Sequence, residues 1–286
     1  MTKVGSLLYS LTLALGLLMS AVVAVAQDAP SGLYTFNDAR PEAVTAYRRG
    51  WVEILEFGRW QEAERQYRKA LSIDPDFVIA MSVLARLLPS GDERRQLEQD
   101  IRSHMHRVDE DGRLLLDAYV KTLELMNARD LGQPVSMDLR EDLRKRAVSN
   151  YREFLFKYPG EWSVLIEYVE WIHASSGPQG ALEAVAELTS QSVVAASRGF
   201  SYFPAYFHAE LDQLEQATTL ADEFAQRLPK TELPQPHYVR AFIALRASDL
   251  ELAKTEIDKA LSLDSKHILA QRLKAQIDAA VAAQSG

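Results

Sequence analysis

Glu170 and His173 form a Glu-x-x-His motif, a spacing that places a carboxylate and an imidazole on one face of a helix. Carboxylate-bridged di-iron bundles use this spacing, but each site needs a second copy of the motif. The sequence contains a single copy. The motif therefore predicts a structural or groove-lining role and no bound metal.

Two further polar clusters have a simpler explanation than chemistry. His104 and His106 would lie about 200° apart around a helix, so they cannot share a metal ion there. The run from Asp109 to Gly112 resembles a calcium loop, but it lacks that loop's later Gly and its final Glu. The cap of a following helix explains the run.

The motifs of common enzyme classes are missing. The sequence has no Gly-x-Ser-x-Gly elbow, no phosphate loop and no His-Glu-x-x-His. It has no Cys, which excludes thiolate metal ligands and cysteine nucleophiles. The net charge of −8 argues against a nucleic acid partner. We therefore predict no catalytic residue, no cofactor and no metal, in a protein that is not an enzyme.

The chain after residue 40 consists of helix-like segments separated by short breaks at Gly, Pro and Asp. Strand-like alternation bounded by turn pairs does not occur. With 47% hydrophobic residues, the chain has ample material for a packed core. These patterns predict an all-α fold of about thirteen helices.

Small and bulky residues recur along these segments at a fixed spacing. A small side chain lets two antiparallel helices pack closely, and a bulky one a turn later fills the neighbouring gap. Ala181 follows Ala147 by 34 residues. The residues predicted to carry this structural repeat are Ala63, Tyr67, Ala70, Pro75, Ala147, Tyr151, Pro159, Ala181, Ala253 and Ala260.

These segments resemble tetratricopeptide repeats (TPR), a unit of 34 residues that forms a helical hairpin. The match is best from Ala46 to Asp76, although Trp51 stands where the repeat usually has Gly or Ala. The resemblance implies an α-solenoid of antiparallel hairpins in a right-handed superhelix. The resemblance covers most of Ala43 to Ala283 and is interrupted between Leu88 and Asp138. The predicted solenoid spans residues 41–286, with N-terminal repeats in 41–127 and C-terminal repeats in 138–286. Residues 267–283 fit a closing helix.

The N-terminus resembles an export signal. Lys3 precedes an apolar run, and Ala24 and Ala26 provide the small residues that a signal peptidase needs. We expect a signal peptide at 1–26, a linker at 27–40 and a periplasmic or secreted protein of bacterial type. In the alternative, the apolar run stays uncut as a membrane anchor.

An aromatic pattern gives the candidate binding site. Tyr202 and Tyr206 are repeated 36 residues later by Tyr238 and Phe242, so the two pairs should stack on adjacent first helices. In TPR proteins these first helices line a concave groove that binds peptides. The predicted groove also includes Phe203, Glu167, Glu170 and His173. It would suit an apolar or basic peptide segment. Alternatively, these aromatic residues only pack between hairpins.

Two functions of different class remain open. The first is an exported scaffold that binds a protein or peptide partner, such as an envelope or secretion component, without chemistry of its own. The second is an α/α-toroid enzyme that processes envelope polysaccharides. The second function requires carboxylates that converge at loop ends, whereas those of this chain mostly lie on predicted helix faces.

Overall fold

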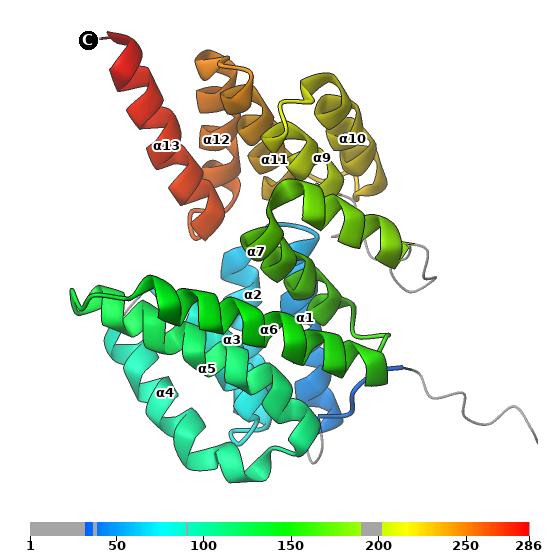
Figure 1. Cartoon of the computed structure of the whole chain (residues 1–286), viewed down its shortest axis with the longest axis vertical. Coiled ribbons are helices and arrows are strands. Elements are labelled where there is room, and N and C mark those ends of the chain that lie inside the picture. The colour runs from blue at the N-terminus through cyan, green and yellow to red at the C-terminus, as the bar shows by residue number, and fades with distance from the viewer. Residues whose placement is uncertain (1–31, 37–38, 90, 190–201, 286) are drawn as a thin grey trace, which may run out of the picture.

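The computed structural model describes residues 32–36, 39–89, 91–189 and 202–285. All regular structure in these ranges is helical, as predicted, with twelve α-helices and one 3-10 helix (Figure 1). The predicted signal peptide, with Ala24 and Ala26, lies outside the described residues. The helices are α1 (Pro41–Leu55), α2 (Trp60–Ile73), α3 (Val78–Leu87), α4 (Gly91–His104), η1 (Met105–Arg107), α5 (Glu110–Asp130), α6 (Met137–Lys157), α7 (Trp162–Thr189), α9 (Phe203–Glu210), α10 (Leu214–Arg227), α11 (Pro234–Arg246), α12 (Leu250–Leu263) and α13 (Ile268–Ser285).

The same hairpin turn recurs along the chain. Gly58, Asp212 and Ser248 each have a φ near +60° to +71° and each lies two residues before the next helix, which is α2, α10 or α12. A positive φ reverses the chain in few residues. Gly177, with a φ of 72°, interrupts α7 in the same way. The hairpins α1–α2, α9–α10 and α11–α12 are therefore built alike.

The repeat alanines lie at the contacts between paired helices. Each of Ala63, Ala70, Ala147, Ala181, Ala253 and Ala260 is 0% exposed. Tyr67 and Tyr151 are also fully buried, whereas Pro75 and Pro159 are exposed and follow helix ends. In the first hairpin, a Cβ on Gly50 would lie 2.6 Å from Cε1 of Tyr67. The small residue at this contact is thus Gly50, which leaves its neighbour Trp51 free to be large.

The segment before α1 is part of the core. Tyr34 and Phe36 are buried, so residues 33–36 of the predicted linker pack against the helices and do not form a free connection. The Tyr34 backbone N–H donates to Glu161 (2.8 Å) and its hydroxyl donates to Asp109 (2.5 Å). Asp109 also accepts from the N–H of Gly112 (2.7 Å), which is the helix cap that the sequence predicts. This segment joins α1 to the starts of α5 and α7.

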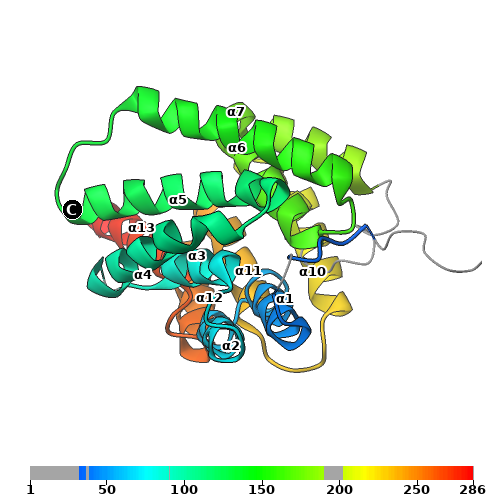
Figure 2. The same cartoon turned by 90° about the horizontal axis from the view of Figure 1, so that it is seen from below.

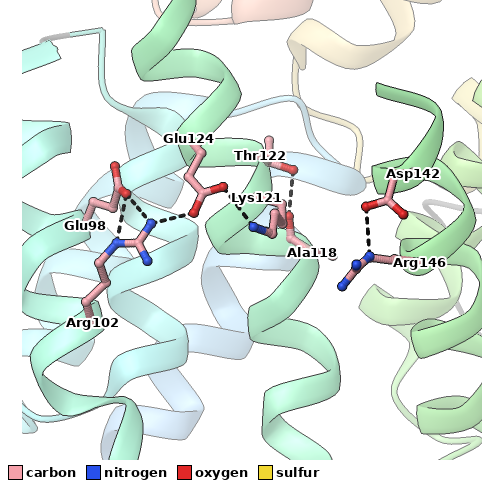
Figure 3. A network of polar contacts seen from close by, with 8 residues as sticks. All are labelled: Glu98, Arg102, Ala118, Lys121, Thr122, Glu124, Asp142 and Arg146. Carbon is pink, nitrogen blue, oxygen red and sulfur yellow. Dashed lines mark hydrogen bonds and ion pairs between the residues drawn. The ribbon is translucent and has the colours of Figure 1, made fainter. Parts of the chain in front are cut away.

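The middle helices are arranged in rows. Figure 2 shows α6, α5 and then α3 and α4 one after another. Arg102 of α4 pairs with Glu124 of α5 (2.6 Å), and each of these two residues also has a partner on its own helix, Glu98 (2.7 Å) and Lys121 (3.1 Å), as Figure 3 shows. Because these pairs are largely exposed, they fix the orientation of the helices and add little stability. No helix in the described ranges is both long and apolar enough to cross a membrane.

The first and last hairpins touch each other. The N–H of Gln61 donates to Asp264 (2.9 Å), Lys266 pairs with Glu64 (2.6 Å), and the Trp60 ring lies 5.5 Å from the His267 ring. We call this set the closing contact. It joins the start of α2 to the turn before α13, which lie side by side in Figure 1.

Helix α13 extends from the closing contact and covers α12. Leu273 and Ile277 are buried, as the sequence predicts for a closing helix. Ile268 and Leu269 are half-buried and face the hollow described next. The start of α13 therefore forms part of a wall between the two halves of the molecule.

Candidate functional site

A hollow lies where the N-terminal and C-terminal halves of the described chain face each other. It has a larger compartment of about 440 Å³ and a smaller compartment of about 270 Å³. Glu170, Tyr202 and Leu269 line both compartments, so the two adjoin. We call the combined space the central hollow. Its walls come from α1, α2, α3, α4, α5, α7, α9, α11 and α13.

Seven of the eight predicted groove residues line the central hollow. Glu167 lines the larger compartment. The smaller compartment is lined by Glu170, His173, Tyr202, Phe203, Tyr206, Phe207, Tyr238 and Leu269. Phe242, the eighth residue, lines neither compartment and packs on Tyr206. The structure thus brings together residues that the sequence places more than 70 positions apart, from Glu167 to Tyr238.

The predicted stacking between adjacent first helices is confirmed. The rings of Tyr206 on α9 and Phe242 on α11 are 4.1 Å apart and nearly parallel, at 15°. Tyr238 is parallel to Tyr206 at 6.5 Å. Tyr206 is half-buried, whereas Phe242 is buried. Tyr206 therefore combines packing with access to the hollow, and Phe242 serves packing.

Glu170 is the carboxylate of the hollow that has no partner within the described part of the chain. Its side chain is exposed and lines both compartments of the hollow. Desolvation by these walls, with the nearby charge of Glu167, raises the pKa of Glu170 to about 7, although Arg86 and His173 act in the opposite direction. The group thus changes charge near neutral pH.

Glu167 lies one helical turn before Glu170 and, unlike Glu170, is paired within the protein. Arg86 pairs with it at 2.8 Å, and the Tyr119 hydroxyl donates to it at 2.5 Å. The Arg86 guanidinium also lies 4.1 Å from the centre of the Tyr119 ring, a cation–π contact. Burial lowers the pKa of Arg86, but the Glu167 carboxylate more than offsets this, so Arg86 stays charged. Glu167 is thus engaged within the protein.

His173 is held by a neighbouring helix. Its Nε2 lies 2.5 Å from Oε2 of Glu210 on α9, and its ring packs on Phe207 at 4.9 Å. Glu170 and His173 share one wall of the hollow, but among the described residues only His173 has a hydrogen-bond partner. In the part of the chain that the structure describes, no three His, Cys, Asp or Glu residues are grouped to hold a metal ion.

Sequence reasoning missed the opposite wall. Trp51 and Trp60 of the first hairpin, with Arg86 of α3 and Ile268 of α13, line the larger compartment. One signal was available, because Trp51 is bulky at a repeat position that is usually small. No pattern in the sequence indicated that α13 contributes to this wall.

The recurring hairpins and their buried alanines give the chain a TPR-like helical-repeat fold. No protein-family model and no curated protein sequence matches it. Among solved structures, it is similar to the TPR protein TTC0263 of Thermus thermophilus, with 17% identity over 84% of this chain and 98% of that chain and a TM-score of 0.40. It is also similar to PilF of Pseudomonas aeruginosa, with 17% identity over 82% of this chain and 98% of that chain and a TM-score of 0.35.

Proposed function

We propose that the protein is an exported, non-enzymatic scaffold that binds a peptide segment of an envelope protein in the central hollow. One observation carries this proposal, namely that the smaller compartment is lined mainly by aromatic and aliphatic side chains, with Glu170 as a carboxylate unpaired among the described residues. It adjoins the larger compartment, whose lining is more polar and includes Arg86, Arg94, Arg129 and Arg272. Apolar walls with a few polar groups are typical of binding sites. A concave helical-repeat surface offers this arrangement to a peptide.

The enzyme alternative has weaker support. Glycoside hydrolysis uses a pair of carboxylates on either side of the scissile bond. Glu167 is paired with Arg86 and Tyr119, and Asp130 with Arg94, which leaves Glu170 as the available acid of the hollow within the described residues. Turnover of envelope glycans by the mature protein would favour the enzyme over the scaffold.

Export rests on residues 1–26 and is a proposal from the sequence. N-terminal sequencing of the protein from its own cells tests it. We expect the mature chain to begin at Gln27. A chain that keeps its apolar run would indicate a membrane-anchored scaffold.

The binding site is tested by capture of the partner from envelope extract with matched variants. Tyr206→Ala removes a wall of the hollow, and Phe156→Ala removes a side chain on α6 that is 89% exposed and lines neither compartment. We expect Tyr206→Ala to lose most of the captured partner and Phe156→Ala to retain it, with both variants folded by circular dichroism. Equal capture by both variants would contradict a binding role for the hollow.

A further inference from the structure

The smaller compartment combines aromatic walls with the unpaired carboxylate of Glu170. We infer that it binds one cationic side chain of the partner, a lysine or an arginine, with Glu170 as the counter-ion and Tyr202, Tyr206 and Tyr238 as aromatic walls. This inference rests on the proposed function and specifies which part of the partner enters the hollow.

The side chains that line the smaller compartment favour a cation with an aliphatic stem. Three tyrosines and two phenylalanines, Phe203 and Phe207, line this compartment together with Leu269. Aromatic faces attract cations, and the attraction grows as water is excluded. Lysine and arginine also carry an aliphatic stem, which suits the apolar part of the same wall. A neutral apolar side chain would use the walls but would leave Glu170 desolvated without a partner.

The pairing of the nearby carboxylates also favours a cationic side chain. Within the described residues, two of the three carboxylates near the compartment already have cationic or ring partners, since Glu167 pairs with Arg86 and Glu210 with His173. Glu170 remains without a hydrogen bond or ion pair in those residues, and it lines the opening between the compartments. A partner cation at this point would complete the pairing. An acidic side chain would meet Glu170 and Glu210 and would be repelled.

The volume of the smaller compartment favours a single side chain. A volume of about 270 Å³ is below the range of about 300–1,000 Å³ that is usual for a whole small-molecule ligand. It suits a single long side chain, while the adjoining compartment of about 440 Å³ is available to the neighbouring residues of the same peptide.

The charge of Glu170 gives the interaction a dependence on pH. Since its pKa is raised to about 7, the carboxylate is mostly neutral at pH 6 and mostly charged at pH 8. Cation binding should therefore strengthen over this range. The charged or titratable groups that act on Glu170 are Glu167, Arg86 and His173, and His173 is itself paired with Glu210. The other such groups that line the hollow are Tyr202, Tyr206 and Tyr238, with Arg94, Arg129, Asp130 and Arg272 in the larger compartment.

Three capped peptides test the inference: acetyl-Leu-Lys-Leu-Leu-amide and the same peptide with norleucine or glutamate in place of lysine. Their affinities for the mature protein are measured at pH 8 and pH 6 by NMR titration. We expect the lysine peptide to bind at least about tenfold more tightly than the norleucine peptide at pH 8 and to lose most of this preference at pH 6. The glutamate peptide should bind most weakly.

Two variants assign the effect. Glu170→Gln keeps the shape of the side chain and removes its charge, so it should abolish both the lysine preference and its pH dependence. Glu223→Gln makes the same change on an exposed surface of α10 and should behave as the wild type.

A lysine preference that persists in Glu170→Gln would overturn the inference, and so would a norleucine peptide that binds the wild type as tightly as the lysine peptide. In the latter case, loss of both peptides in Tyr206→Ala would still uphold the proposed function, whereas a hollow that responds to none of the peptides would contradict both.

Discussion

Glu167 and Glu170 lie one turn apart on α7, and their surroundings give them different roles. Glu167 is buried between Arg86 and Tyr119, so its charge is neutralised inside the protein. Glu170 faces the central hollow and has no such partner among the described residues. The sequence could identify both as candidates on one helix face. It could not distinguish them, because Arg86 lies 81 positions before Glu167 and no local pattern connects them.

The Arg86–Glu167 pair should be strongly coupled. Glu167→Leu leaves a buried guanidinium unpaired and should lower the free energy of unfolding by about 3–5 kcal/mol. Arg86→Leu should act similarly by leaving the carboxylate unpaired. The double variant should lose less than the sum of the two, as measured by urea denaturation. Strictly additive losses would show that the pair is not coupled.

Glu170 should make stability decrease with rising pH. Its pKa is raised from 4.5 to about 7, so the stabilising contribution of the protonated form is complete below about pH 4.5 and is lost as the pH rises through 7. Glu170→Gln avoids this loss. We expect the variant to gain stability relative to wild type between pH 5 and pH 8 in urea denaturation. A constant difference across that range would contradict the raised pKa.

At the scale of elements, sequence periodicity was sufficient to predict helices and much of their pairing. The alanine spacing marked the contacts of α2, α6, α7 and α12, because a buried small residue leaves a periodic signal. It failed at α1, where the small residue is Gly50 and not position 51. It also failed before α1, since two aromatic residues in a segment with Pro and Gly give no period, although Tyr34 and Phe36 are buried.

Gly50 should resist substitution although it lies in a helix. Alanine favours helices over glycine by about 0.5–1 kcal/mol. Its Cβ would, however, lie 2.6 Å from the fully buried Tyr67 ring, and overpacking of this kind costs about 1–3 kcal/mol. We therefore expect Gly50→Ala to lower the melting temperature. An unchanged or raised melting temperature would mean that α1 and α2 can separate at little cost.

A substitution in the turn before α12 should stabilise the protein. Ser248 is exposed and has a φ of 61°, a conformation that glycine adopts without strain. Ser248→Gly should therefore raise the free energy of unfolding by up to about 1 kcal/mol. Thermal unfolding measures the change, and a destabilised variant would show that the serine side chain makes a favourable contact in the turn.

At the scale of the whole molecule, the closing contact distinguishes the fold from an open solenoid. Helical-repeat proteins are organised by contacts between neighbouring units, and such contacts do not require the first and last units to meet. Here Gln61 and Asp264, 203 residues apart, are joined by a hydrogen bond. Local periodicity carries no information on such a pair. The contact matters for function because the first hairpin supplies Trp51 and Trp60 to the wall of the central hollow.

The closing contact should weaken in acid. His267 is fully buried between Trp60 and Tyr238, and burial lowers its pKa from 6.5 to about 3. The stability that the neutral ring contributes is therefore complete above pH 6.5 and is lost as the pH falls toward 3, by up to about 1.4 kcal/mol per pH unit. His267→Asn keeps an acceptor for the N–H of Ala270 and removes this titration.

Hydrogen exchange at pH 7 and pH 5 checks this expectation. Amides at 57–61 of the wild type should lose protection at pH 5, beyond the intrinsic effect of pH on exchange, relative to amides of α5. In His267→Asn the protection of 57–61 relative to α5 should be the same at both values. Equal protection of the wild type at both pH values would contradict a coupling between His267 and the closing contact.

Site-specific photo-cross-linking tests most directly whether the central hollow holds a partner. A photoreactive residue replaces Tyr206 or Leu269, which line the hollow, and Phe156 on the exposed face of α6 serves as the control position. The cross-links are formed in intact cells and mapped by mass spectrometry. We expect both hollow positions to cross-link to the same short segment of one protein. This segment should contain a lysine or an arginine, and the control position should not cross-link to it. Cross-links to that partner from position 156 alone, or none from the hollow, would contradict the account.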